Sequence, residues 1–142
     1  MPHNCQALIL HCIDFRLGKA IKEYLEKNEL LGDCDILSVA GGVKGLTCPE
    51  EPSDRIFIFR QINTSIHLHK IQGIVLINHT DCGAYGGSGK FTFADDERKF
   101  HIQELREARA IILEKYPQLI IKMVLAKVEP TDKVSFEEIN SQ

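Results

Sequence analysis

The sequence of 142 residues has no apolar run near the roughly 20 residues needed to cross a bilayer. The N-terminus also lacks the basic segment followed by an apolar one that marks a secretory signal peptide. No stripe of basic residues is present, and 17 Lys and Arg against 20 Asp and Glu give a formal net charge of −3. We therefore expect a cytoplasmic protein with neither a membrane nor a nucleic-acid partner.

Cysteine is also sparse, with five residues in the chain, an odd number that excludes a full disulfide framework. In a reducing compartment such thiols stay free or bind metal ions. The apolar fraction of 44% is typical of globular domains, so a core can form without disulfides.

Short apolar runs alternate with segments of helical periodicity along the chain. We predict strands at residues 6–11, 35–39, 73–77 and 119–128, and helices at residues 17–28, 53–70 and about 95–115. Ser53 is predicted to cap the second helix, residues 43–52 to be irregular, and residues 83–94 to form a glycine-rich loop. Residues 128–142 are polar with spaced apolar positions, which fits an edge strand, an arm on a partner chain or a disordered tail.

This alternation predicts a single α/β domain over residues 1–142, with a mostly parallel sheet and helices on both faces. Ligands of such sheets bind beyond the carboxyl ends of the strands, where the strand order reverses. Polar motifs follow the first and third predicted strands, so these two strands should be neighbours. The predicted strand order is 2-1-3-4.

Thiol and imidazole groups at the ends of these two strands have the composition of a zinc site. Cys12 follows the first strand, and His79 and Cys82 follow the third, separated by two residues that one tight turn can span. Zinc prefers these ligands, and three protein ligands leave one tetrahedral position open for catalysis. Gly83 lets the chain turn away from the site. We predict one Zn²⁺ per subunit on Cys12, His79 and Cys82.

Asp14 and Arg16 are predicted to control the open position of this metal. In an extended segment Asp14 points to the same face as Cys12, and Arg16 can hold its carboxylate with a fork of donors. Asp14 would accept a proton from the reacting water and orient it. If Arg16 released Asp14, the carboxylate could occupy the open position and block the site.

Other polar residues have simpler interpretations. Asp81 is predicted to be a turn residue that could bond a backbone amide near His79. Tyr85 and Ser88 lie in the glycine-rich loop and could contact substrate or have no role. The remaining cysteines and histidines are interpreted as structural or incidental: Cys5, Cys34, Cys48, His3, His11, His67, His69 and His101.

The two motifs together resemble those of the β-class carbonic anhydrases. Cys-x-Asp-x-Arg stands at residues 12–16 and His-x-x-Cys at residues 79–82, and the turn Ala40-Gly41-Gly42 after the second strand is similar to theirs. The resemblance implies an α/β fold, a homodimer or higher homo-oligomer, and reversible hydration of CO₂ to bicarbonate by zinc-bound hydroxide. It covers about residues 6–128.

The sequence departs from that family at Phe15, where the family usually has Ser, and at Ser38-Val39, where it often has Arg-Asn. The family's helical N-terminal arm has no counterpart before the first strand. We take Phe15, Ala40, Gly41, Gly42 and Gly83 as candidate pocket residues, with Phe15 making the pocket more apolar. Two alternatives follow: a hydrolase of carbonyl sulfide or carbon disulfide on the same site, or a zinc-binding protein without turnover.

Overall fold

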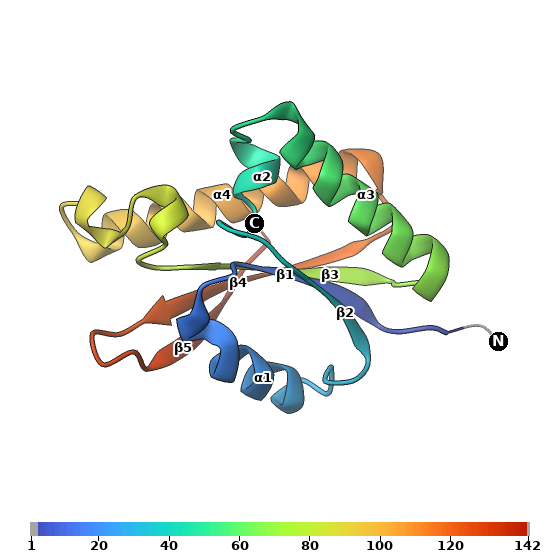
Figure 1. Cartoon of the computed structure of the whole chain (residues 1–142), viewed down its shortest axis with the longest axis horizontal. Helices are drawn as coiled ribbons and strands as arrows, with labels where there is room; N and C mark the ends of the chain where they lie inside the picture. The colour runs from blue at the N-terminus through green and yellow to red at the C-terminus, as the bar shows by residue number, and fades with distance from the viewer. Residues whose placement is uncertain (1–2, 142) are drawn as a thin grey trace.

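A computed structural model describes residues 3–141, so Met1, Pro2 and Gln142 of the predicted domain lie outside the described residues. Five strands form one sheet in the order β2-β1-β3-β4-β5 (Figure 1). The strands are β1 (Ala7–His11), β2 (Cys34–Ser38), β3 (Gly73–His79), β4 (Ile120–Val128) and β5 (Val134–Ile139). The helices are α1 (Gly18–Lys27), α2 (Lys44–Thr47), α3 (Pro52–His69) and α4 (Ala94–Lys115), with short 3-10 turns at Phe15–Leu17, Gly83–Tyr85 and Ser88–Lys90.

The predicted order of the first four strands is confirmed. These strands pair in parallel, with Leu10 of β1 lying between Leu37 of β2 and Leu76 of β3. The tail forms an edge strand, because β5 pairs antiparallel with β4 from Val128↔Val134 to Met123↔Ile139. Of the three alternatives for residues 128–142, the structure therefore shows the edge strand.

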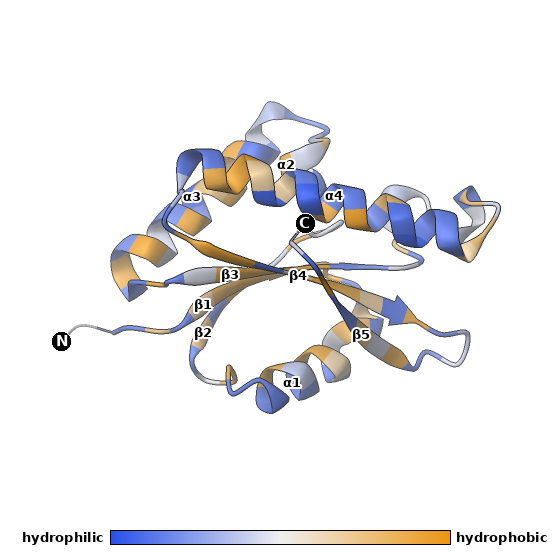
Figure 2. Cartoon of the chain, turned by 180° about the vertical axis from the view of Figure 1, so that it is seen from behind, coloured by the Kyte–Doolittle hydropathy of each residue, from blue (hydrophilic) through white to orange (hydrophobic). Residues whose placement is uncertain are grey.

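Helices cover both faces of the sheet, as the alternating pattern predicted. α1 lies on one face, and α2, α3 and α4 lie on the other (Figure 1). The strands are largely hydrophobic, whereas the long helices alternate hydrophobic and hydrophilic residues (Figure 2). One core packs Ile62 and Leu105 against the sheet, and the other packs Ile21 and Leu25 against its opposite face. Among residues 3–141, no helix has the length and apolarity required to span a membrane.

Three local predictions differ from the structure. Ser53 lies inside α3, and the N-cap is Glu51, which exchanges side-chain and backbone hydrogen bonds with Asp54. Pro52 fits the first helical position because it has no N–H to leave unpaired. Residues 43–52 are not wholly irregular, since they contain the single turn of α2. β3 continues to His79, two residues beyond the predicted end, so His79 belongs to the strand.

The strand order reverses between β1 and β3. The chain leaves β1 through α1 to reach β2 on one side, and then crosses through α3 to β3 on the other side of β1. In sheets of this kind the two connections diverge at the reversal and leave a crevice beyond the carboxyl ends of the strands. Cys12 and His79 lie at that point.

The turn after β2 approaches β3 so closely that only glycine fits at its centre. Gly42 has a φ of +57°, and a Cβ there would lie 2.9 Å from Asn78 Oδ1 and 3.0 Å from the carbonyl oxygen of Ile77. Asn78 Oδ1 in turn accepts a hydrogen bond from the backbone N–H of Val43 at 3.2 Å.

We predict that Gly42→Ala lowers the free energy of unfolding by about 1–3 kcal/mol, because it combines a strained φ with these contacts. Urea unfolding measures the loss. Gly18→Ala is the matched control, since Gly18 has a right-handed helical conformation and nothing lies within 4 Å of its added Cβ. Equal stability of the two variants would contradict the packing described for Gly42.

Candidate metal centre

His79 presents a buried nitrogen without a hydrogen-bond partner. The residue ends β3 and is 1% exposed. Its Nδ1 lies 2.8 Å from the carbonyl oxygen of Thr80, which can only accept, so Nδ1 carries the proton. Nε2 therefore has a free lone pair, and no group among the described residues 3–141 forms a hydrogen bond with it. Ligating histidines are commonly oriented by such a bond on the other ring nitrogen.

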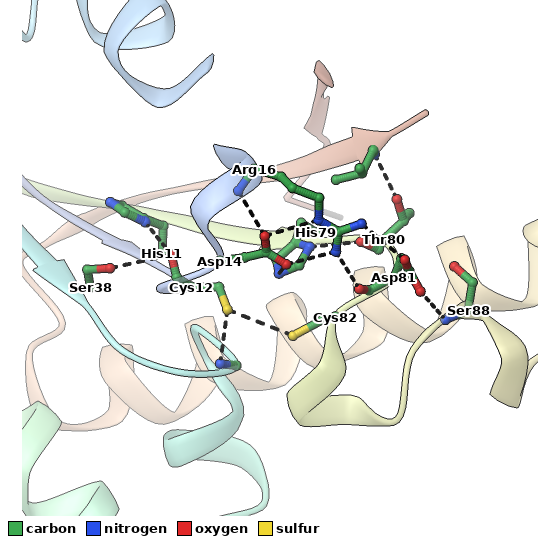
Figure 3. Close-up of polar contacts among 12 residues, drawn as sticks. His11, Cys12, Asp14, Arg16, Ser38, His79, Thr80, Asp81, Cys82 and Ser88 are labelled. Atoms are coloured by element: carbon green, nitrogen blue, oxygen red, sulfur yellow. Dashed lines mark hydrogen bonds and ion pairs between the residues drawn. The ribbon is translucent and has the colours of Figure 1, made fainter. Parts of the chain in front are cut away.

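Two thiols face this lone pair. Cys12 lies just beyond β1 and Cys82 lies in the turn after β3, and their Sγ atoms are 3.9 Å apart (Figure 3). One ligand atom from each of Cys12, His79 and Cys82 lies within 4.8 Å of the others, and all three residues are buried. Two sulfurs bound tetrahedrally at 2.3 Å from one zinc ion would be about 3.8 Å apart. The donor set and its spacing thus fit a zinc ion.

The charge of the two thiols is unequal. Cys12 has a pKa well below its usual range, first because the Cys82 thiol donates to it and also because the N–H of Gly41 donates to its Sγ at 3.3 Å. The pKa of Cys82 is raised, first by the bond to Cys12 and then by burial. Burial lowers the pKa of His79, but Cys12, the carbonyl oxygen of Thr80 and the charge of Asp14 together outweigh it, so the pKa of His79 is raised. Cys12 is thus the thiol of the pair that ionises first.

Arg16 joins two carboxylates beside the thiols. Its Nη2 donates to Asp14 Oδ2 at 2.8 Å, its Nε donates to Asp14 Oδ1 at 3.1 Å, and its backbone N–H donates to the same Oδ1 at 2.9 Å. These bonds from Arg16 lower the pKa of Asp14 to about 2. Asp14 is therefore ionised at neutral pH and can only accept hydrogen bonds. Its Oδ2 lies 3.8 Å from His79 Nε2, which places it next to the three donor atoms.

Asp81 is the second partner of Arg16, a role that no motif in the sequence indicates. Arg16 Nη1 lies 3.1 Å from Asp81 Oδ2, and Nη2 donates to the carbonyl oxygen of Asp81 at 2.9 Å (Figure 3). Asp81 is a turn residue as predicted, with a φ of +55°. Its Oδ1 accepts from the N–H of Ser88 at 2.9 Å, and not from an amide near His79. Because Arg16 and Asp81 are separated by 65 positions in the sequence, no local pattern indicates the contact.

The glycine-rich loop is braced by buried polar contacts. Ser88 Oγ donates to Glu97 Oε1 at 2.7 Å, and Glu97 Oε2 accepts from the N–H of Asp81 at 2.8 Å. Tyr85 is buried and its hydroxyl donates to Glu104 at 2.9 Å. Tyr85 and Ser88 therefore fasten the loop to α4, a structural role that was not among the two interpretations drawn from the sequence.

Of the predicted pocket residues, Gly41 and Ala40 lie beside the cluster, whereas Phe15 points into solvent. Gly41 contacts the Cys12 sulfur, and Ala40 lines a neighbouring cavity of about 320 Å³ together with Ala84. Phe15 is 89% exposed, so a single chain gives it nothing to pack against. Its place in a pocket stays a prediction.

Two relatives of known sequence are described as uncharacterized proteins. An uncharacterized protein of Rickettsia bellii is 29% identical over 120 residues, which cover 82% of this chain and 73% of that protein. An uncharacterized protein of Rickettsia conorii is 30% identical over 120 residues, which cover 82% of this chain and 64% of that protein. The chain thus spans less than two thirds of the second relative's length.

Solved structures with the same fold are β-carbonic anhydrases. A tetrameric β-carbonic anhydrase of Sordaria macrospora has a TM-score of 0.62 at 12% identity, over 94% of this chain and 81% of the other. The β-carbonic anhydrase CafA of Aspergillus fumigatus has a TM-score of 0.55 at 15% identity, over 99% of this chain and 77% of the other. At these identities the likeness shows the fold.

Comparison of the sequence with models of protein families shows the family of this protein. The model described as "Putative carbonic anhydrase" matches residues 2–134, nearly the whole chain. Together with the sheet order and the Cys-His-Cys cluster, this match places the protein among the carbonic anhydrase-like proteins of that family.

Proposed function

We propose that this protein catalyses the reversible hydration of CO₂ to bicarbonate with one zinc ion per chain. The observation that carries the proposal is the free Nε2 of His79, buried against two thiols and beside a carboxylate held by Arg16. A structural zinc site is usually closed by a fourth protein ligand. Here three donors cluster, and the fourth neighbour, Asp14, is held by Arg16.

Cys12, His79 and Cys82 would hold the ion. When bound, zinc would supply the Lewis acidity that lets water lose a proton near neutral pH. Two thiolates neutralise the charge of Zn²⁺, so this acidity is weaker than with three histidines. Gly41 offsets part of that effect, because its N–H withdraws charge from the Cys12 sulfur.

Asp14 would orient the reacting water. It is ionised, and its Oδ2 lies beside His79 Nε2, so it can accept a hydrogen bond from water at the open side of the cluster. A water held this way keeps a lone pair directed away from Asp14, toward the substrate. Arg16 fixes the carboxylate in place and, through Asp81, ties it to the loop that carries Cys82.

CO₂ is small and apolar, and the surroundings of the cluster suit it. Ala40 and Ala84 adjoin the two glycines Gly41 and Gly83, and both alanines line the neighbouring cavity. Ile13 and Phe15 flank Asp14 and are 63% and 89% exposed.

We also propose a homo-oligomer in which a second chain covers this exposed apolar pair and encloses the site. The tetrameric state of the Sordaria macrospora enzyme supports the idea. Sedimentation equilibrium tests it, since a protein that stays monomeric at every concentration would leave Ile13 and Phe15 in water.

We predict that protein of measured zinc content hydrates CO₂ in a stopped-flow assay, with activity that rises from neutral pH to about pH 9. Cys82→Ser should lose the zinc held by Cys12, His79 and Cys82 and, with it, the activity. Cys48→Ser is the control, because Cys48 is an exposed thiol outside the cluster.

Zinc-loaded protein without hydration across this range would refute the proposed activity. Sulfide released from carbonyl sulfide or carbon disulfide by the same sample would then assign the hydrolase. Bound zinc without either reaction would indicate a zinc-binding protein without turnover.

We predict that Arg16→Gln keeps its zinc but loses at least about 100-fold in kcat, because Asp14 is freed to move toward the ligand atoms. Arg16→Gln in an Asp14→Ala background should then have little further effect, since the residue that Arg16 restrains is gone. Additive losses in the double variant would show that Arg16 acts on the substrate directly and not through Asp14.

A further inference from the structure

A second group of metal-type donors lies at the opposite end of the sheet. One ligand atom from each of Cys5, Asp35 and His69 lies within 4.8 Å of the others. Cys5 precedes β1, Asp35 is the second residue of β2, and His69 is the last residue of α3. In Figure 1 the N-terminal segment and the end of α3 lie at the same side of the molecule, away from the glycine-rich loop.

Backbone hydrogen bonds fix the positions of the segments that carry the three donors. The N–H of Cys5 donates to the carbonyl oxygen of His69 at 3.0 Å, so the thiol and the imidazole are fixed to each other through the main chain. Asp35 pairs with Leu8 in the parallel ladder between β1 and β2. The cluster therefore lies on three anchored elements and not on a mobile loop.

The imidazole and the carboxylate are hydrogen-bonded to each other, so a metal ion that binds both would replace the proton between them. His69 Nδ1 lies 2.8 Å and 2.7 Å from the two carboxylate oxygens of Asp35. Ser65 Oγ donates to Asp35 Oδ2 at 2.6 Å, which orients the carboxylate from behind. An outer hydrogen bond of this kind is typical of a ligating carboxylate.

The thiol of Cys5 has no comparable partner. Its Sγ makes one long contact of 3.7 Å with the carbonyl oxygen of Ala7. Burial, followed by the negative charge of Asp35, raises the pKa of Cys5. Without a cation the cluster therefore disfavours a thiolate, whereas a divalent ion would remove the repulsion between the sulfur and the carboxylate.

We propose that Cys5, Asp35 and His69 form a second site for a divalent transition-metal ion of the zinc class. A thiolate and a carboxylate together neutralise the ion, and the imidazole supplies the third ligand. Thiolate and imidazole donors favour Zn²⁺ or Co²⁺ over Mg²⁺ and Ca²⁺, which prefer oxygen. Binding through Nδ1 releases the thiol proton of Cys5, and the imidazole of His69 then carries its proton on Nε2.

The second site is separate from the candidate catalytic centre. Cys5 and Cys12 are the ends of a nearly extended segment of seven steps, which spans about 23 Å at 3.3 Å per residue. No ion could bridge the two clusters. All three donors are partly exposed, so an ion can enter from solvent. Its effect would be structural, joining the N-terminal segment to β2 and α3.

Titration with Co²⁺ tests the proposal on the whole chain, because thiolate-bound Co²⁺ has charge-transfer absorption. Wild type should bind two equivalents. Cys5→Ser and His69→Gln should each bind one, and Cys48→Ser should bind two as the matched control. Cys82→Ser should keep the equivalent held by Cys5, whatever its activity toward CO₂. Wild type that binds one equivalent, or Cys5→Ser that keeps two, would overturn the second site.

Alkylation of wild type gives an independent test that needs no variant. With Zn²⁺ at about ten times its Kd for the site, modification of Cys5 by iodoacetamide should slow about tenfold. Exposed Cys48 should react at the same rate with and without zinc. Equal rates for Cys5 with and without zinc would show that Asp35 and His69 form only an ion pair.

Discussion

The buried lone pair of His79 is the constraint on which the rest of this end of the molecule depends. A buried polar atom without a partner costs about 1–3 kcal/mol, and nothing in the protein among residues 3–141 bonds to Nε2. Two thiols lie beside it, with their sulfurs 3.9 Å apart. One zinc ion would satisfy the nitrogen and both sulfurs at once. The proposed metal thus explains why three unlike groups are buried together.

The surrounding elements keep these groups in place. Parallel pairing of β1 with β3 brings Cys12 near His79, and Gly42 lets the turn after β2 lie against Asn78. The N–H of Gly41 then reaches the Cys12 sulfur. Each contact depends on a main-chain position, so the geometry of the cluster is set by the sheet and its turns.

Arg16 extends this rigidity to the proposed reacting groups. It holds Asp14 ionised and immobile, and through Asp81 it connects β1 to the loop after β3. Ser88 of the same loop and Glu97 of α4 both donate to or accept from Asp81 and so brace it. A displacement of that loop would therefore alter the position of the carboxylate as well as that of Cys82.

The sequence predicted the features that depend on local pattern or on one shared ligand. Apolar runs marked the four parallel strands, and the assumption that Cys12 and His79 meet was enough to order them. The prediction that Ser53 caps α3 is wrong. Glu51 is the N-cap, because its side chain bonds to the backbone of Asp54 and the side chain of Asp54 bonds to the backbone of Glu51. The edge strand was one of three alternatives, since its pairing with β4 is tertiary.

Contacts between distant residues could not be predicted in this way. The bond between Arg16 and Asp81 spans 65 residues, and Cys5, Asp35 and His69 have no common spacing. Such groups meet only because the sheet register and the end of α3 bring them together. In the sequence alone, an isolated cysteine or histidine such as Cys5 or His69 is best interpreted as structural. Only the fold shows that these residues lie beside Asp35.

Zinc K-edge absorption spectroscopy of the Cys5→Ser variant tests the central claim most directly, since this variant should hold zinc only at Cys12, His79 and Cys82. The account predicts two sulfur ligands at about 2.3 Å and one imidazole nitrogen at about 2.0–2.1 Å. A zinc shell with one sulfur, or with none, would contradict it.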